Sequence, residues 1–264
     1  MDLQLTDRLA LITGSTAGIG FAIAQGLAAE GARVVITGRN SARVDEALER
    51  LRRAVPDAKA QGVAADCATS AGAQRVFAAV PEVDILVNNL GIYERKPFFE
   101  IPDEDWMRVF EVNVMSGIRF ARHYAPPMVK RGWGRIVFIS SESGLNIPRE
   151  MIHYGMTKTA QLTISRGLAI ELAGTGVTVN TVLPGPTRTE NTEQLRAQRA
   201  KAAGMTLPEF EKDFFVTFRP TSLLKRFTSA EEVANLAVYV CGAASSATTG
   251  AALRADGGVV NQIM

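Results

Sequence analysis

The sequence predicts an α/β protein built on a doubly wound parallel sheet of about seven strands, with helices on both faces. Two features of the sequence lead to this prediction: the predicted strands are apolar at nearly every position, and they alternate with helices. Short runs that are apolar throughout, such as LALIT at 9–13 and RIVFIS at 135–140, alternate with longer helical stretches. Strands of this kind are buried on both faces, and right-handed crossovers through helices make such sheets parallel. The 264 residues suit a single domain of this class.

Capping and helix-breaking residues mark where the predicted helices begin and end. Gly31 ends the first helix, Ser41 is suited to cap the second, and Pro56 stops it. Thr69 or Ser70 caps the third helix. Strands are predicted at 9–13, 33–37, 60–65, 84–88, 135–140, 177–183 and 251–255, and helices at about 19–30, 41–55, from 70 onward, 103–131, 154–173 and 231–240.

The alternation of strands and helices stops between 184 and about 228. This stretch contains Pro186, Pro208 and Pro220, and its phenylalanines cluster at 210–218. In an open α/β sheet, a long insertion after the carboxyl end of a strand is well placed to cover a substrate. We therefore expect 184–228 to be a substrate lid, with a solvated surface excursion as the alternative. The mixed charges from 188 to 201 are expected to lie on a solvated helix.

The charge balance and the few cysteines and histidines exclude several classes of protein. The 29 Lys and Arg residues against 27 Asp and Glu give a net charge of +2, too balanced for binding nucleic acid or an anionic membrane. Cys67, Cys241, His123 and His153 provide neither a disulfide framework nor a metal-ligand pattern, so no metal is expected. No signal-type segment is recognisable, and no apolar stretch approaches the ~20 residues of a membrane helix. The cytoplasm is the expected compartment.

A glycine-rich loop, TGSTAGIG at 13–20, joins the first predicted strand to the first helix. Glycines there allow a tight turn and a close approach of the backbone to a pyrophosphate, which the helix N-terminus attracts. A purely structural turn is the alternative. After the second strand no acidic residue is present to bind the ribose of NAD, and Arg39 could instead pair with a 2′-phosphate. The sequence therefore favours NADP(H), with NAD(H) possible and a surface role as the alternative for Arg39.

Tyr154 and Lys158 are four residues apart at the start of a predicted helix, so they share one face. A lysine ammonium beside a phenol lowers the pKa of the tyrosine, which can then act as a general acid or base. Surface packing is the alternative for such a pair. Ser140 and Ser141 stand at the carboxyl end of the fifth strand, where open α/β sheets bind their ligands.

Further motifs accompany these residues: the run NNLG at 88–91, Asn113 in the long helix, Ser141 thirteen residues before Tyr154, and Pro184-Gly185 after the sixth strand. Together with the loop TGSTAGIG and Lys158, and in this order, they resemble the short-chain dehydrogenase/reductase family over nearly the full chain, and within it the 3-oxoacyl-ACP reductases. Two departures stand out: Leu90 replaces the usual alanine, and Ala17 stands where many NADP-using relatives carry a basic residue. The prediction of NADP therefore rests mainly on Arg39.

The resemblance implies a role for each matching residue. Ser141, with Ser140 as the neighbouring alternative, would polarise the substrate oxygen, and Tyr154 would give or take the proton. Lys158 would hold the nicotinamide ribose and tune Tyr154, while Asn113 would anchor a water that relays protons to solvent. The implied cofactor-binding residues are Gly14, Ser15, Thr16, Gly18, Ile19, Gly20, Arg39, Asp66 (whose alternative is a helix cap), Cys67, Asn88, Asn89, Tyr154, Lys158, Pro184, Gly185, Thr187 and Thr189.

The substrate pocket is expected to be largely apolar. Tyr93, Met151, Ile152 and the phenylalanines at 210–218 are candidates for its wall, whereas the residues at 149–150 either contact the substrate or face solvent. The resemblance implies an NAD(P)-dependent oxidoreductase of ketones and secondary alcohols in a homotetramer, with NADPH-linked reduction of a 3-oxoacyl-type substrate favoured. An NAD-dependent sugar, steroid or polyol dehydrogenase is the alternative within this class. A nucleotide-binding sensor without chemistry is the alternative outside it.

Overall fold

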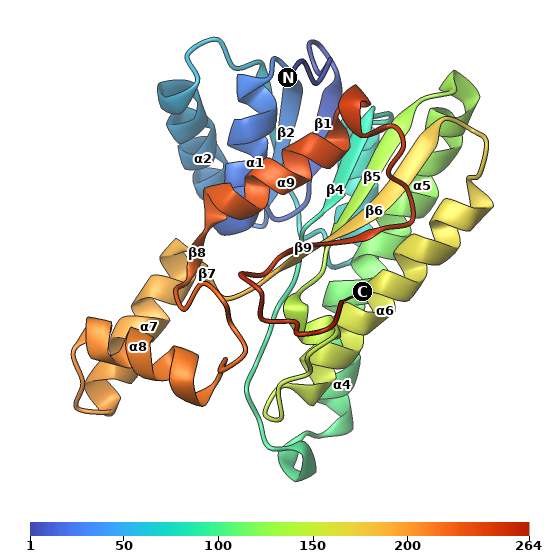
Figure 1. Cartoon of the computed structure of the whole chain (residues 1–264). Helices are drawn as coiled ribbons and strands as arrows, with labels where there is room; N and C mark the ends of the chain where they lie inside the picture. The colour runs from blue at the N-terminus through green and yellow to red at the C-terminus, as the bar shows by residue number, and fades with distance from the viewer. Residues whose placement is uncertain (264) are drawn as a thin grey trace.

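A parallel sheet of seven strands lies at the centre of the computed structural model, which describes residues 1–263, the side chain of Asn191 excepted (Figure 1). The strand order is β3-β2-β1-β4-β5-β6-β9. This confirms the predicted doubly wound α/β fold, and each predicted strand is found to within one residue at either end. The strands are β1 (Leu9–Ile12), β2 (Arg33–Gly38), β3 (Ala60–Ala64), β4 (Ile85–Asn88), β5 (Gly134–Ile139), β6 (Val177–Pro184) and β9 (Ala252–Ala255).

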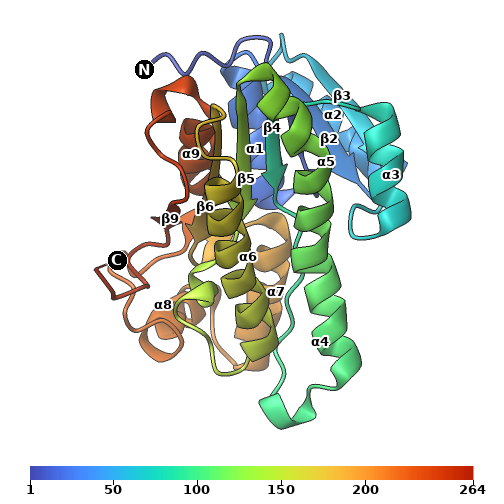
Figure 2. The same cartoon turned by 90° about the vertical axis from the view of Figure 1, so that its right-hand side faces the viewer.

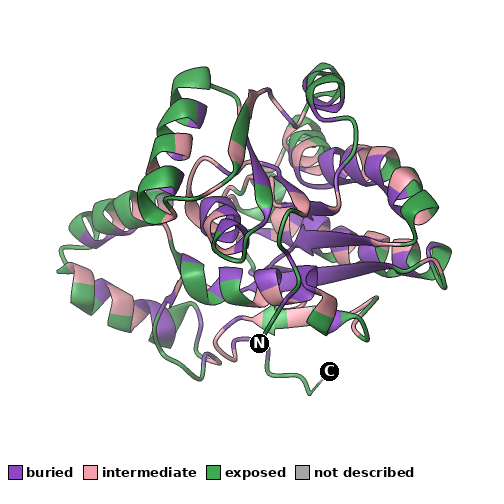
Figure 3. Cartoon of the chain, turned by 90° about the horizontal axis from the view of Figure 1, so that it is seen from above, coloured by how far each residue is buried: buried purple, intermediate pink, exposed green. Residues whose placement is uncertain are grey.

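Helices cover both faces of the sheet (Figures 1 and 2). One layer consists of α1 (Gly18–Ala29), α2 (Ser41–Ala54) and α9 (Ala230–Cys241), and the other of α3 (Ser70–Ala79), α5 (Ser116–Arg131) and α6 (Ile152–Glu171). Successive side chains of a strand point to opposite faces, so Ala10 and Ile12 of β1 pack into the first layer and Leu11 into the second. Figure 3, which shows the chain from above, has buried strands lying between helices whose outer surfaces are exposed.

The helix caps follow the sequence closely, with one correction. Thr69 caps α3, because its hydroxyl accepts a hydrogen bond from the Gly72 amide at 3.0 Å. The predicted cap of α2, Ser41, is instead its first helical residue. Asn40 is the cap, since its side-chain oxygen accepts from the Arg43 amide at 3.2 Å. Asn and Ser cap helices about equally well, so the residue type alone does not separate the two neighbours.

The helix predicted over 103–131 is interrupted in the middle. It consists of α4 (Asp103–Phe110), a π-helical segment η2 (Glu111–Met115) and α5. A π turn takes one more residue per hydrogen-bonded ring than an α turn, and such turns are frequent at functional sites. The π segment contains Asn113, which is buried. The helix predicted over 103–131 therefore has the expected ends, but its middle is π-helical, which was not predicted.

The segment 184–228 stands away from the sheet and carries α7 (Glu190–Ala202) and α8 (Leu207–Thr217) (Figure 1). A two-stranded ribbon, β7 (Thr187–Arg188) with β8 (Thr228–Ser229), joins the two ends of this segment to the body. No helix within residues 1–263 is long and apolar enough to span a bilayer. Short 3-10 turns complete the structure at Phe98–Glu100, Glu142–Gly144 (η3) and Ala243–Ser245.

Candidate active site

The carboxyl ends of β1, β4, β5 and β6 meet at one edge of the sheet. Crossovers run in opposite directions from β1 and β4, and ligands of open α/β sheets bind at such a switch point. A groove lies along this edge. Its lining residues are Ala17, Gly18, Ile19, Gly20, Asn89, Gly91, Ile92, Tyr93, Ile139, Ser140, Ser141, Tyr154, Lys158, Pro184, Gly185, Thr187, Thr189 and Thr192.

The glycine loop needs its glycines for conformation and for space. Gly14 and Gly18 have φ angles of +64° and +58°, a region that favours glycine. A Cβ on Gly20 would come within 2.4 Å of the Asn89 side-chain amide. That amide donates hydrogen bonds to the carbonyls of Thr13 and Gly14, at 2.9 and 3.0 Å. Asn89 therefore holds the loop against the end of β4, as well as lining the groove.

An acidic side chain already occupies the positive end of α1. The Gly18 amide donates a hydrogen bond to Glu190 Oε2 at 3.0 Å, and Arg50 pairs with the other carboxylate oxygen at 2.9 Å. Glu190 is the first residue of α7, so it reaches the loop from the 184–228 segment. A carboxylate at this amide shows that the loop accepts an anion, which is what a dinucleotide pyrophosphate requires.

The residues expected to bind the adenosine part of the cofactor differ in whether their side chains are free in this structure. Arg39 follows β2 and is exposed, with no hydrogen bond or ion pair to any described residue, so it is available for a 2′-phosphate. A Cβ on Gly38 would lie 2.5 Å from Thr16, which places Thr16 beside the end of β2. Asp66 accepts a hydrogen bond from the Ala68 amide at 3.1 Å, which is local turn chemistry.

Three predicted cofactor ligands direct their side chains elsewhere. Ser15 is fully buried, and its hydroxyl donates to the Ile12 carbonyl and accepts from the Thr37 amide. Cys67 is buried too, and burial raises the pKa of its thiol to about 11. The Asn88 side chain is buried outside the groove, and its amide has no hydrogen-bond partner among the described residues. Any contact of these residues with a cofactor would have to come from their backbone.

Three of the four predicted catalytic side chains, those of Ser141, Tyr154 and Lys158, line the same groove. Tyr154 and Lys158 share one face of α6, with the lysine Nζ 5.5 Å from the centre of the tyrosine ring. Ser141 caps the short turn η3 after β5, and its hydroxyl accepts from the Ser143 amide at 3.1 Å. Ser140 donates its hydroxyl to the Lys158 carbonyl at 2.8 Å and so anchors α6. Of the two serines, Ser141 is therefore the one available to a substrate.

Lys158 is connected to Asn113 through Gln161, which was not predicted as a site residue from the sequence. The lysine ammonium donates to the Ile139 carbonyl at 2.9 Å and to Gln161 Oε1 at 3.1 Å. The Gln161 amide donates in turn to the Asn113 backbone carbonyl at 2.7 Å. The Asn113 side chain holds both backbone groups of Ile92, at 2.8 and 2.9 Å. Gln161 thus links the lysine to the backbone of Asn113, the residue expected to anchor a proton-relaying water.

Burial dominates the electrostatics of the catalytic pair. It lowers the pKa of Lys158 to about 7. It also raises the pKa of Tyr154 well above its usual value, although the Ser141 hydroxyl acts in the opposite direction. The expected lowering of the tyrosine pKa by the lysine is therefore not seen here: the loss of hydration of the phenol dominates, and the lysine is not among the groups that shift this pKa.

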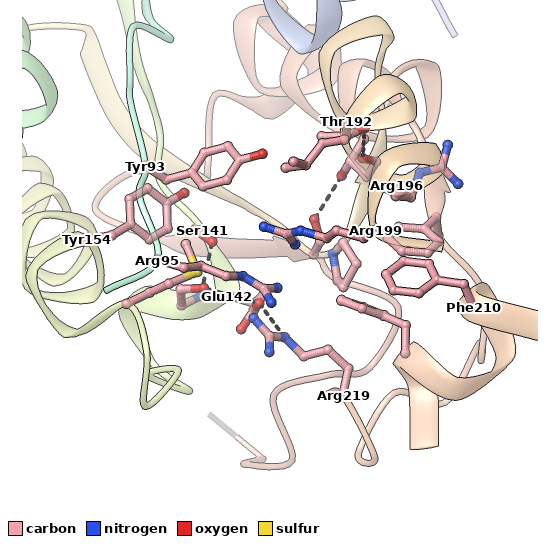
Figure 4. Close-up of a pocket in the computed structure, with 18 residues that line it drawn as sticks. Tyr93, Arg95, Ser141, Glu142, Tyr154, Thr192, Arg196, Arg199, Phe210 and Arg219 are labelled. Atoms are coloured by element: carbon pink, nitrogen blue, oxygen red, sulfur yellow. Dashed lines mark hydrogen bonds and ion pairs between the residues drawn. The ribbon is translucent and has the colours of Figure 1, made fainter. Parts of the chain in front are cut away.

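A second cavity, of about 160 Å³, adjoins the groove, and residues of α7 and α8 form part of its wall (Figure 4). Tyr93, whose ring centre is 6.0 Å from that of Tyr154, and Met151 line it as expected. Ile152 does not, because consecutive residues of the first turn of α6 point in different directions. The lining residues are Tyr93, Arg95, Ser141, Glu142, Ser143, Met151, Tyr154, Gly185, Pro186, Thr187, Thr192, Leu195, Arg196, Arg199, Phe210, Phe214, Arg219 and Phe227.

The wall of this pocket is mostly apolar, as expected, but four arginines also line it, two of them from α7. The charged residues of α7 were expected to be solvated, but two of them, Arg196 and Arg199, line the cavity. Arg219 pairs with the buried Glu142 at 2.9 Å, and Arg196 pairs with Glu211. Nearby, Glu150 lies 3.7 Å from Arg95. Arg149, the other residue of the open pair at 149–150, is exposed.

Comparison with known proteins agrees with this geometry. A family model described as short chain dehydrogenase matches residues 8–200. Uncharacterized oxidoreductase YvaG of Bacillus subtilis is 46% identical over 100% of both chains. The 3-oxoacyl-[acyl-carrier-protein] reductase FabG of Aquifex aeolicus is 33% identical over 98% of this chain and 100% of its own.

Solved structures match equally well. L-sorbose reductase from Gluconobacter frateurii, complexed with NADPH and L-sorbose, superposes with a TM-score of 0.93 at 32% identity, over 100% of both chains. The residues of the groove, the shared fold and the family match all lead to one conclusion. The chain belongs to the short-chain dehydrogenase family, and it is an oxidoreductase of CH–OH and carbonyl groups.

Proposed function

We propose that the protein is an NADP(H)-dependent reductase that converts a ketone to a secondary alcohol. One observation carries this proposal: Ser141 and Tyr154 line both the dinucleotide groove and the adjoining cavity. They are therefore among the side chains that a carbonyl would meet between the two spaces, together with Tyr93, Thr187 and Thr192. Hydroxyl groups at that boundary suit a reaction in which hydride arrives from one side and a proton from the other.

Each residue of the site has a task in this reaction. The nicotinamide, when bound, supplies the hydride chemistry. Ser141 donates a hydrogen bond to the substrate oxygen and orients it. Tyr154 gives its proton to the same oxygen as negative charge develops there. Lys158, held by Ile139 and linked through Gln161 to the π segment, keeps a proton beside the tyrosine and contacts the ribose.

Arg39 supports NADP(H) over NAD(H). It is exposed at the carboxyl end of β2, and no acidic residue lies between the end of that strand and α2 to hold a free ribose. Relatives support the same choice, since the L-sorbose reductase structure contains NADPH and a putative gluconate 5-dehydrogenase from Beutenbergia cavernae contains NADP. A guanidinium binds a phosphate through paired, charge-assisted hydrogen bonds.

Two substrate classes follow from the relatives. The likeness to FabG supports a 3-oxoacyl-type ketone, as we expected from the sequence. Likeness to L-sorbose reductase and to a galactitol 2-dehydrogenase supports a sugar or polyol. The four arginines of the cavity favour a small polar substrate over an acyl chain. A sensor without chemistry would need neither Tyr154 nor Lys158.

The test is a fluorescence titration of the protein with NADPH and NADH, followed by a ketone-reduction screen. Arg39→Ala should weaken NADPH binding far more than NADH binding, whereas Arg53→Ala, at an exposed arginine near the far end of α2, should change neither. Tyr154→Phe should abolish turnover and keep NADPH affinity. Equal losses for both nucleotides in Arg39→Ala would refute the cofactor assignment, and full activity of Tyr154→Phe would refute the mechanism.

We also propose the wider organisation of the protein. Residues 1–264 would form a single dinucleotide-binding and catalytic domain, with 184–228 as the lid over its substrate cavity. A homotetramer is the assembly that the family resemblance implies, and light scattering would test it. Two buried free thiols, Cys67 and Cys241, suit a reducing compartment such as the cytoplasm.

A further inference from the structure

Positive charge accumulates in the substrate cavity from three separate parts of the chain. Arg95 comes from the connection between β4 and α4, Arg196 and Arg199 come from α7, and Arg219 follows α8. Figure 4 shows Arg95, Arg199 and Arg219 reaching into the same part of the cavity, across from Tyr154. Only one carboxylate, that of Glu142, lies among the described residues of the lining.

Two of these arginines already have close carboxylate partners, and two do not. Glu142 accepts from Arg219 at 2.9 Å, and Glu211 binds Arg196. For Arg95 the nearest carboxylate is Glu150, whose closest atom is 3.7 Å away, beyond hydrogen-bond distance. Arg199 makes no hydrogen bond or ion pair with any described residue, although it is only partly exposed. The cavity therefore contains guanidinium groups whose donors are not satisfied by the protein.

The guanidinium groups of Arg95 and Arg199 also repel each other. Burial lowers the pKa of Arg95, the positive charge of Arg199 lowers it further, Glu150 raises it, and Arg219 lowers it again. Like charges brought together in a partly desolvated space are unfavourable unless an opposite charge joins them. A planar guanidinium is the side chain best matched to a carboxylate or phosphate, which it binds through two parallel hydrogen bonds.

We infer that the cavity selects a substrate that carries an anionic group, a carboxylate or a phosphate, and that Arg95 and Arg199 bind this group. This inference rests on the proposed reductase function, because it places the reacting carbonyl at Ser141 and Tyr154 in the same cavity. The substrate class is then a small oxo acid, sugar acid or phosphorylated ketone. Arg95 belongs to the body and Arg199 to the 184–228 segment, so one anion would hold the two together.

The experiment compares matched pairs that differ in the anionic group. Acetoacetate is compared with methyl acetoacetate, gluconate with sorbitol, and dihydroxyacetone phosphate with dihydroxyacetone. Binding is measured by calorimetry with and without NADP(H), and turnover by NADPH oxidation or NADP reduction. The variants are Arg199→Gln and Arg95→Gln, and the control is Arg149→Gln, an exposed arginine close to the cavity in sequence but outside its lining.

At least one anionic compound should bind and react better than its neutral partner. A lost charge-assisted contact should lower kcat/KM for that compound by about 10- to 100-fold in Arg199→Gln and Arg95→Gln. The neutral partner should be nearly unaffected, and Arg149→Gln should behave as the wild type. The compound pair with the largest difference in kcat/KM between its anionic and neutral members shows whether the site prefers a carboxylate or a phosphate.

The two proposals fail in different ways. Equal turnover of anionic and neutral partners, unchanged in Arg199→Gln, would overturn the anion site and leave the reductase intact. Anion binding that is lost in Arg199→Gln, without turnover of any compound, would uphold the anion site and overturn the reductase. Calorimetry with no preference for any anion, in the wild type or the variants, would overturn the inference irrespective of activity.

Discussion

Replacing Lys158 by Met should remove turnover and change how the stability of the protein depends on pH. Lys158 is buried, with 4% of the residue exposed, and burial lowers the pKa of its ammonium from 10.5 to about 7. Between these two values the unfolded lysine binds a proton that the folded lysine does not. The free energy of unfolding of the wild type therefore rises with pH across this window and is at its lowest, as far as this group is concerned, below about pH 7.

The size of the effect follows from the same two values. Each pH unit between them corresponds to about 1.4 kcal/mol, so the lysine contributes about 5 kcal/mol against folding at low pH. Against this, the variant leaves the Ile139 carbonyl and Gln161 Oε1 without their donor, at roughly 1–3 kcal/mol for each group. Near neutral pH, the cost of the buried charge in the wild type and the cost of the unpaired acceptors in the variant nearly cancel. The change of the unfolding free energy with pH is therefore a sharper measure of the buried charge than its value at one pH.

The assay is urea unfolding of the cofactor-free wild type and Lys158→Met at several pH values. From about pH 7 to about pH 9 the wild type should gain about 3 kcal/mol relative to the variant, and below about pH 6 the difference should become constant. Lys201→Met, at an exposed lysine of α7, is the matched control and should follow the wild type. A stability difference between wild type and Lys158→Met that stays the same at every pH would refute the argument from burial.

Two further predictions concern the contacts around the groove. Glu190→Gln should tighten NADPH binding by about 2- to 5-fold, because a charged competitor leaves the Gly18 amide, and an unchanged dissociation constant in a fluorescence titration would contradict this. Gln161→Leu should lower kcat by about 10-fold or more and displace the pH profile of turnover while sparing NADPH affinity, because Lys158 loses its link to Asn113. Wild-type kinetics of Gln161→Leu across the pH range would show that the link is only structural.

The strands and the catalytic residues could be predicted from the sequence because their signals are local. A run such as LALIT is apolar at every position only when both faces of a strand are buried. Tyr154 and Lys158 are brought together by helix geometry alone, so their four-residue spacing was enough to pair them.

The substrate cavity could not be predicted in the same way, because its residues meet only in the tertiary structure. Arg95 and Arg199 are about a hundred residues apart and come from a connection and a helix that face each other across the cavity. From sequence, the charges of α7 match those of a solvated helix. Gln161 did leave a local signal, since it follows Lys158 by three residues on the same helix face, but its partner Asn113 lies on a different element.

The π-helical segment at 111–115 has a consequence for how this chain can change in length. An extra residue within a helix turns everything after it by about 100° relative to what comes before. Here α4 contacts α6, whereas α5 packs on β4, β5 and α3. Deleting one residue between them should restore an ordinary helix and rotate one of the two away from these neighbours. We therefore expect substitutions along this helix to be tolerated more readily than the loss or gain of a single residue.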